Sequence, residues 1–232
     1  MTKKKKKFPP LTLTEQEGLL GGLYLAAEMT IVPSLITILG HQFGGFSEGT
    51  ANYLFYWINA VCCGFIFRQL LLESLVRAGQ RFGRFLLTVL AGFLILLSAN
   101  QLMTGLAQML IPDFINANNA SLAQMVRENP VSMTMGLVLL VPLAEECLFR
   151  GLLFVGLAEK SRYGAYALSV LAFCAIHVVG YLGTVEPLTL AICFIQYIPS
   201  GLVLAWSCEQ SGSMIAPILI HAAINAGSIL TL

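Results

Sequence analysis

Seven long apolar segments alternate with short polar stretches along the chain. They span residues 18–40, 51–72, 85–111, 131–158, 164–182, 187–208 and 213–231. A helix needs about 20 apolar residues to cross the hydrocarbon core of a bilayer, and most of the segments meet this length. The alternating pattern of outer-membrane strands is absent, so the spans are expected to be helices, which satisfy their own backbone groups in lipid. The pattern therefore predicts an all-α fold, a polytopic transmembrane helical bundle of about seven helices, or eight.

The composition agrees with this class. Hydrophobic residues make up 57% of the chain and charged residues 11%, whereas a soluble domain carries about 25% charged residues. So few charges cannot cover a water-facing surface. The six cysteines contain no Cys-x-x-Cys pair and lie mostly within the apolar segments. We therefore expect free, buried thiols and no disulfide framework.

Basic residues are distributed unevenly around the predicted helices. If the N-terminus is cytoplasmic, the inner stretches hold ten lysines and arginines, including the run Lys3–Lys7, and the outer stretches hold only Arg127. Inner loops of membrane proteins carry such an excess, which predicts a cytoplasmic N-terminus and an outer C-terminus. A basic run can also bind nucleic acid, but beside a membrane span it is typical of an anchor at the cytoplasmic surface. No nucleic-acid partner is expected.

The same pattern divides the chain into three regions. The stretch 112–130 is the largest outer loop, in which Ser121-x-x-Gln124 could cap a short surface helix. His41 lies at the outer end of the first helix, where we expect it to be solvated. The regions are a basic cytoplasmic tail at 1–17, a first group of helices with few diagnostic residues at 18–129, and a helical core at 130–232.

One charged cluster interrupts the apolar segment 131–158. An ionised side chain near the middle of a bilayer costs at least about 2.5 kcal/mol, so such charges indicate a functional site. Glu146 and Arg150 are four residues apart on one helical face and should pair, because an unpaired buried charge is costly. Glu145 lies about 100° around the helix from Glu146 and has no partner within its own helix, which makes it the candidate for acid–base or ligand chemistry. Pro142 frees a backbone carbonyl one turn earlier, which a neighbouring helix or water must satisfy.

Two histidines lie at a comparable depth in later helices. Phe173 and His177 share one helical face, and His221 and Asn225 share another, because each pair is four residues apart. At about 1.5 Å per residue, both histidines and Glu145 fall within a slab around mid-membrane. Singly, each buried histidine is more often a packing residue than a catalyst, but the shared depth favours a common site. We expect the fourth, fifth and seventh helices to line one polar cavity.

A carboxylate, two imidazoles and an amide in such a cavity are suited to hydrolysis. The carboxylate can take a proton from a water molecule that an imidazole holds and orients. Histidine and asparagine donors can stabilise the oxyanion that forms when water attacks an amide. The sequence contains no evident Ser-His-Asp spacing and no His-Glu-x-x-His zinc motif.

Three short motifs follow one another within these apolar helices and resemble those of a known family. They are Glu145-Glu146-x-x-x-Arg150, Phe173-x-x-x-His177 and His221-x-x-x-Asn225, with flanking Phe149-Arg150-Gly151 and Gly212-Ser213-Met214-Ile215-Ala216-Pro217. Together they resemble the CAAX protease and bacteriocin-processing family, abbreviated CPBP and also called Abi. The resemblance covers about residues 130–228 and would make the last region the catalytic core.

The resemblance implies an intramembrane endopeptidase of the glutamate type or the metalloprotease type. It gives Glu145 and His177 the role of a water-activating pair, and His221 and Asn225 the role of oxyanion stabilisers. No cofactor is required in the first reading. In the second, a divalent metal such as zinc could be held by Glu145, His177 and His221.

The same resemblance assigns a supporting role to Glu146, Arg150 and Phe173. The partners it implies are the lipid bilayer and a peptide or membrane-protein substrate. A multi-pass protein of a bacterial cell membrane, acting in bacteriocin maturation or self-immunity, is the expected setting.

Three other functions remain open at this point. Intramembrane Glu, Arg and His also mark transporters and proton relays, although no inverted repeat is evident. A non-catalytic immunity or scaffold protein could keep the same motifs. A cysteine protease could use Cys174, one turn from His177, but it would leave Glu145 unexplained.

Overall fold

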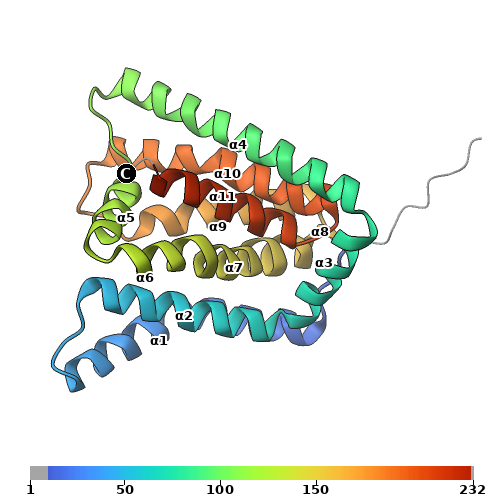
Figure 1. Ribbon diagram of the computed structural model, residues 1–232, viewed down its shortest axis with the longest axis horizontal. Coiled ribbons are helices and arrows are strands. Elements are labelled where there is room, and N and C mark those ends of the chain that lie inside the picture. The colour runs from blue at the N-terminus through green and yellow to red at the C-terminus, as the bar shows by residue number, and fades with distance from the viewer. Residues whose placement is uncertain (1–9, 231–232) are drawn as a thin grey trace, which may run out of the picture.

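The computed structural model describes residues 10–230 and folds them into a helical bundle without strands in that range (Figure 1). The expected all-α membrane fold is thereby confirmed, and the lysine run Lys3–Lys7 lies outside the described residues. In chain order the helices are α1 (Glu15–Gln42), α2 (Glu48–Ile66), α3 (Arg68–Gln80), α4 (Phe82–Leu110), α5 (Ala117–Glu128), α6 (Pro130–Met135), η1 (Gly136–Leu140), α7 (Val141–Glu146), η2 (Cys147–Val155), α8 (Gly156–Ala158), α9 (Arg162–Val179), α10 (Pro187–Ser211) and α11 (Ile215–Leu230).

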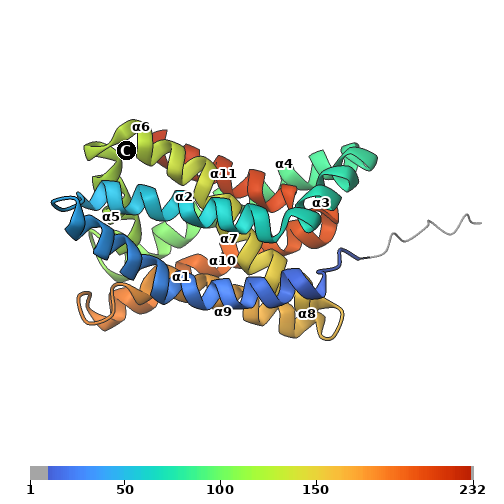
Figure 2. The ribbon, with the colours of Figure 1, turned by 90° about the horizontal axis from the view of Figure 1, so that it is seen from below.

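Within the described range, α1, α4, α9 and α10 are each long and apolar enough to cross a membrane. The prediction of one continuous span at residues 51–72 is wrong. The chain bends in this segment, because α2 and α3 meet at an angle of 76°. Polar side chains begin at Arg68, so the chain turns there and α3 lies at the end of the bundle (Figures 1 and 2). Glu17 on α1 accepts a hydrogen bond of 2.9 Å from the Leu70 N–H. It thereby satisfies one of the donors that a helix start leaves unpaired.

The predicted segment 131–158 forms one continuous helical rod from α6 to α8. Its backbone remains helical at each junction, but η1 and η2 are π-helical, a form that is frequent at functional sites. Pro142 follows η1 and has no N–H, so the Leu137 carbonyl lacks the donor that a π-helix would supply five residues later. The Asn225 side chain on α11 donates to that carbonyl instead, at 2.8 Å.

The rod runs between two groups of helices. Figure 1 shows α1 and α2 on one side of it and α4, α9, α10 and α11 on the other. Helix α10 packs against α9 and α4, and α11 contacts α4, α10 and the rod. Gly201 allows the close approach of α10 to α9, because a Cβ atom there would lie 3.0 Å from the Val170 side chain. The close packing of these helices brings their inner faces to the polar cluster of the rod.

Helix α5 lies within the predicted outer loop 112–130, and its N-cap is a different residue from the one expected. Its N-cap is Asn116, whose Oδ1 accepts hydrogen bonds from the backbone N–H groups of Asn118 at 3.0 Å and Asn119 at 3.3 Å. The cap predicted at Ser121 is wrong, because an asparagine earlier in the chain already satisfies the first donors of the helix. Helix α5 contacts α2, α6 and α9, so this loop is part of the packed bundle.

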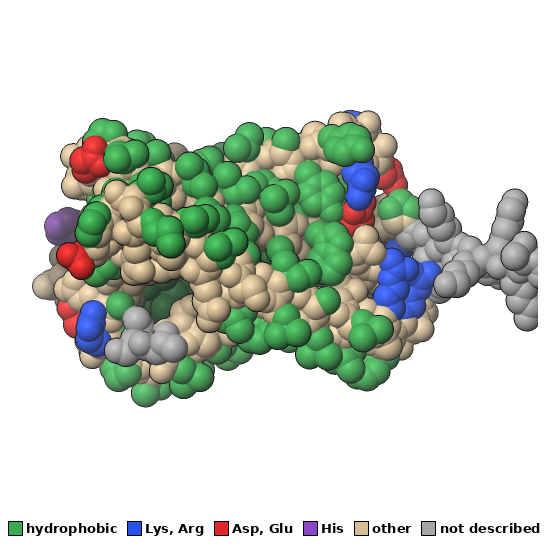
Figure 3. Space-filling model, turned by 90° about the horizontal axis from the view of Figure 1, so that it is seen from above, with side chains coloured by type: hydrophobic (Ala, Val, Ile, Leu, Met, Phe, Trp, Pro, Cys, Tyr) green, Lys and Arg blue, Asp and Glu red, His purple; other side chains and the backbone are tan. Residues whose placement is uncertain are grey.

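The surface supports a membrane setting. Apolar side chains cover the flanks of the bundle, and lysine and arginine side chains gather mainly at the end where α3 and α8 lie (Figure 3). Exposed residues on the flanks include Leu23, Leu87 and Leu94. Apolar patches of this extent are unfavourable in water and suit a lipid environment. His41 is exposed at the end of α1, as expected, and all six cysteines are free.

Candidate active site

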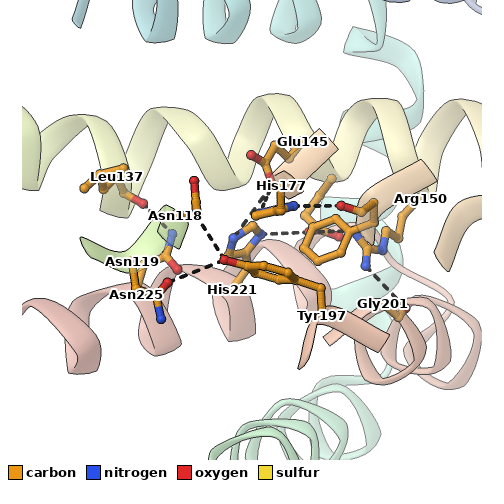
Figure 4. Close-up of polar contacts among 12 residues, drawn as sticks. Asn118, Asn119, Leu137, Glu145, Arg150, His177, Tyr197, Gly201, His221 and Asn225 are labelled. Carbon is orange, nitrogen blue, oxygen red and sulfur yellow. Dashed lines mark hydrogen bonds and ion pairs between the residues drawn. The ribbon is translucent and has the colours of Figure 1, made fainter. Parts of the chain in front are cut away.

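A cavity of about 1400 Å³ lies within the bundle. It is lined by the four residues that the sequence proposed for chemistry, Glu145, His177, His221 and Asn225. Glu145 stands on α7 of the rod, His177 on α9, and His221 and Asn225 on α11. The helices that were expected to meet therefore do meet, and Figure 4 shows the two imidazole rings beside Glu145.

Glu145 faces the two histidines across a narrow gap. Its Oε2 atom lies 3.9 Å from His177 Nε2 and 4.0 Å from His221 Nε2. This oxygen is buried and has no hydrogen-bond partner, although the side chain as a whole is 22% exposed. The separations exceed a direct hydrogen bond, which reaches about 3.2 Å, and are suited to a bridging water molecule. A carboxylate acceptor thus stands where a water molecule could be held.

Both imidazole rings turn the same nitrogen toward Glu145. The Nδ1 of His177 bonds to the Phe173 carbonyl at 2.7 Å, and the Nδ1 of His221 bonds to Glu146 Oε1 at 2.9 Å. A carbonyl or an ionised carboxylate only accepts, so each Nδ1 carries the proton and donates it. In a neutral ring the Nε2 atom is then an acceptor. Three acceptors therefore converge on one point in the cavity wall.

Glu146 and Arg150 form the buried ion pair expected from their spacing. Arg150 Nη1 lies 3.1 Å from Glu146 Oε1, and both side chains are 0% exposed. The guanidinium also donates to the Gly201 carbonyl at 3.3 Å and lies over the Phe173 ring, 4.3 Å from its centroid. Because the same Glu146 oxygen accepts from His221, the pair also orients a histidine. Helical spacing alone did not indicate that second contact.

Asn225 has a backbone partner in this structure. Its Nδ2 donates to the Leu137 carbonyl at 2.8 Å, which accounts for one of its two amide protons. The second proton remains for a ligand in the cavity. The role of Asn225 as an oxyanion stabiliser stays a prediction.

The cavity residues that were not foreseen from the sequence include Tyr197 and Glu28. Tyr197 on α10 contacts the His177 ring, with centroids 4.1 Å apart, and no motif marks it. Glu28 on α1 also lines the cavity. An isolated glutamate inside an apolar segment is a signal that could have identified Glu28.

The three residues considered as zinc ligands are not placed as a metal-binding set. Tetrahedral zinc at about 2.0–2.2 Å from its ligands holds neighbouring donor atoms roughly 3.3–3.6 Å apart. The two distances from Glu145 to the histidines, 3.9 and 4.0 Å, are longer. In the part of the chain that the structure describes, no group of three or more His, Cys, Asp or Glu side chains could hold a metal ion.

Comparison with known proteins supports the resemblance seen in the motifs. Residues 127–227 match the family described as type II CAAX prenyl endopeptidase Rce1-like. The comparisons with curated proteins and with solved structures found no match. The matched range contains the charged cluster of the rod, both cavity histidines and Asn225. Residues 127–227 are therefore similar to an Rce1-like domain, and the similarity covers the segment that carries the candidate site.

Proposed function

We propose that this protein is an intramembrane endopeptidase that hydrolyses a peptide bond in a membrane-associated peptide or protein. One observation carries the proposal: the unpartnered Glu145 Oε2 lies 3.9 and 4.0 Å from two imidazole nitrogens in the wall of a large cavity. The similarity of residues 127–227 to the Rce1-like endopeptidase family supports the reaction class. The arrangement of donors and acceptors supports activation of water by Glu145 and His177.

The three acceptors determine how a water molecule would be held. Water has two O–H donors, so it cannot serve the carboxylate and two neutral Nε2 atoms at once. One imidazole must therefore carry a proton on Nε2 and donate it to the water oxygen. His221 is suited to this role because the Glu146 carboxylate at its Nδ1 stabilises the positive ring. The water then donates to Glu145 and His177 and keeps one lone pair directed into the cavity.

The reaction follows from this arrangement. Glu145 takes a proton from the water as the water oxygen bonds to the peptide carbonyl carbon, and the π electrons of the carbonyl move to its oxygen. That oxyanion accepts a hydrogen bond from His221 Nε2, with the second amide proton of Asn225 as a further donor. When the C–N bond breaks, the leaving nitrogen takes the proton from Glu145. The products are an amine and a carboxylic acid, and the site regains its initial protonation.

The test of this function is cleavage by the purified protein in liposomes. A panel of hydrophobic, amphipathic and prenylated peptides would be incubated in water enriched in oxygen-18, and products identified by mass spectrometry. Wild type should place one heavy oxygen in a new C-terminal carboxylate, and Glu145→Gln should not. If wild type cleaves no peptide, and both forms protect cells equally from a bacteriocin, a binding-only immunity function would replace the proposed one.

We further propose a bacterial cell membrane as the location, with a cytoplasmic N-terminus and a role in bacteriocin maturation or self-immunity. The basic end of the bundle supports the orientation. The test is labelling of single introduced cysteines by an impermeant reagent in intact cells. Thr184→Cys, in the exposed turn between α9 and α10, should react, and Lys160→Cys, at the opposite end, should react only after lysis. The reverse pattern would invert the orientation.

A further inference from the structure

The hydroxyl of Tyr197 is held by asparagines from a segment outside the sequence motifs. It accepts a hydrogen bond of 3.1 Å from Asn118 Nδ2 (Figure 4). It also lies within donating distance of two side-chain oxygens, 3.4 Å from Asn116 Oδ1 and 3.5 Å from Asn119 Oδ1. The hydroxyl therefore has partners as both donor and acceptor, all at the start of α5.

These asparagines are themselves fixed in position. Asn116 is the N-cap of α5, and its Oδ1 accepts from two backbone N–H groups of the first turn. Its Nδ2 donates to Gln196 Oε1 at 2.8 Å. The start of α5 is thus bonded to two adjacent residues of α10, Gln196 and Tyr197. This fixes the Tyr197 ring relative to the outer end of the bundle.

On its other side, Tyr197 contacts the imidazole that faces Glu145. The His177 and Tyr197 rings are 4.1 Å apart and inclined by 32°. Phe173 lies 4.5 Å from the same imidazole, and its carbonyl accepts from Nδ1. That hydrogen bond restrains one atom of the ring and leaves its plane free to tilt. The plane, and with it the direction of Nε2 toward Glu145, depends on the neighbouring aromatic rings.

We propose that Tyr197 is a positioning residue for His177, and that Asn116, Asn118 and Asn119 hold Tyr197 in its working position. The consequence for catalysis rests on the proposed function, whereas the effect on the His177 ring does not. The start of α5 thereby sets the geometry of the water-activating pair, although it lies outside the Rce1-like segment. Tyr197 itself does not act on the reacting atoms.

The kinetic test separates positioning from packing. A misplacement of 1 Å in an active site can cost about 100-fold in rate, so partial loosening should lower kcat by roughly 10-fold. We expect this loss in Tyr197→Phe and in Asn118→Ala, with KM within about 2-fold. Because both changes remove the same contact, the double variant should be no slower than Tyr197→Phe alone.

The matched control is Tyr166→Phe. The Tyr166 hydroxyl bonds to Glu209 at 2.9 Å, and its ring contacts Phe154 with centroids 4.8 Å apart, away from the cavity. This variant should keep the wild-type kcat. The proposal is overturned if Tyr197→Phe keeps the wild-type kcat, or if Tyr166→Phe loses as much activity.

A second readout does not need any cleavage. The chain has three histidines, so nitrogen-15 histidine labelling gives few ring signals, which single substitutions can assign. We expect the His177 signals of wild type to report a proton on Nδ1, and to shift in Tyr197→Phe and Asn118→Ala. The exposed His41 should not change, nor should His177 in Tyr166→Phe. Unchanged His177 signals in Tyr197→Phe would refute the positioning role, even if no substrate were cleaved. Shifted signals without cleavage would support it while refuting the proposed function.

Discussion

Glu145 and Glu146 are neighbours in the chain but lie on two different sides of the rod. Glu146 is on the packed side, where Arg150 and His221 bond to one of its oxygens and no surface is exposed. Glu145 is on the cavity side, where its Oε2 has no partner and faces two imidazoles. The two side chains are chemically the same. The helices that surround each one decide which stabilises the fold and which remains free to accept a proton from water.

The largest expected effect is on the packed side. Arg150→Ala leaves the Glu146 carboxylate buried without its cation, and breaking a buried pair costs about 3–5 kcal/mol. We expect a loss of this size in the free energy of unfolding in detergent, with less folded protein recovered. If Arg150→Ala melted like wild type, the buried Glu146–Arg150 pair would not stabilise the fold.

The matched control is the exposed pair of Arg162 and Glu209. Arg162 Nε lies 2.6 Å from Glu209 Oε1, but the arginine side chain is 55% exposed. Exposed pairs are screened by water and contribute little to stability. Arg162→Ala should therefore change the free energy of unfolding far less than Arg150→Ala. Equal losses would mean that burial does not distinguish the two pairs.

An intermediate effect is expected at Asn225. This residue lines the cavity and also donates a hydrogen bond to the Leu137 carbonyl of the rod. Asn225→Ala leaves the Leu137 carbonyl without a donor, and an unsatisfied buried group costs about 1–3 kcal/mol. Pro142→Ala would supply a backbone N–H, so Asn225→Ala should cost less stability in that background. Cleavage measured on the same double variant tells whether Asn225 also stabilises the oxyanion, because activity would then stay low after stability recovers. If Asn225→Ala lowered the free energy of unfolding equally in wild type and in Pro142→Ala, its bond to the Leu137 carbonyl would not be the source of the stability.

The smallest effect is expected at Cys174, which is buried on α9 one turn from His177. We expect Cys174→Ala to cleave at the wild-type rate, because the nucleophile is water activated at Glu145. The measurement is the initial rate on any peptide that wild type cleaves. A loss as large as that caused by Glu145→Gln would restore the cysteine-protease reading.

The outline of the site, on both sides of the rod, could be predicted because it depends on properties local to each helix. Apolar length gives the spans, rise per residue gives depth, and spacing of four residues gives the Glu146–Arg150 pair. These rules placed Glu145, His177 and His221 in one slab, and the structure brings them together. The same rules could have identified Glu28, because an isolated carboxylate inside a membrane span usually marks a functional site.

The remaining features depend on which helices become neighbours, which periodicity does not determine. The bond between Glu146 and His221 requires a particular rotation of α11, and the contact between His177 and Tyr197 requires the close packing of α9 and α10. The bend at Phe67 and the cap at Asn116 are local, but polar residues near the ends of spans allow several boundaries. The sequence therefore indicated the chemistry more fully than its supporting contacts.

The most direct measurement compares Glu145→Gln with Glu146→Gln for peptide cleavage and thermal unfolding in the same preparation. Both changes keep the shape of the side chain and remove one negative charge. Glu145→Gln should melt like wild type and cleave about 10²–10⁴-fold more slowly, which is the usual contribution of a general base. Glu146→Gln should lose thermal stability as well as activity, because Arg150 and His221 both depend on it. Cleavage by Glu145→Gln at the wild-type rate would contradict the assignment of Glu145 as the base.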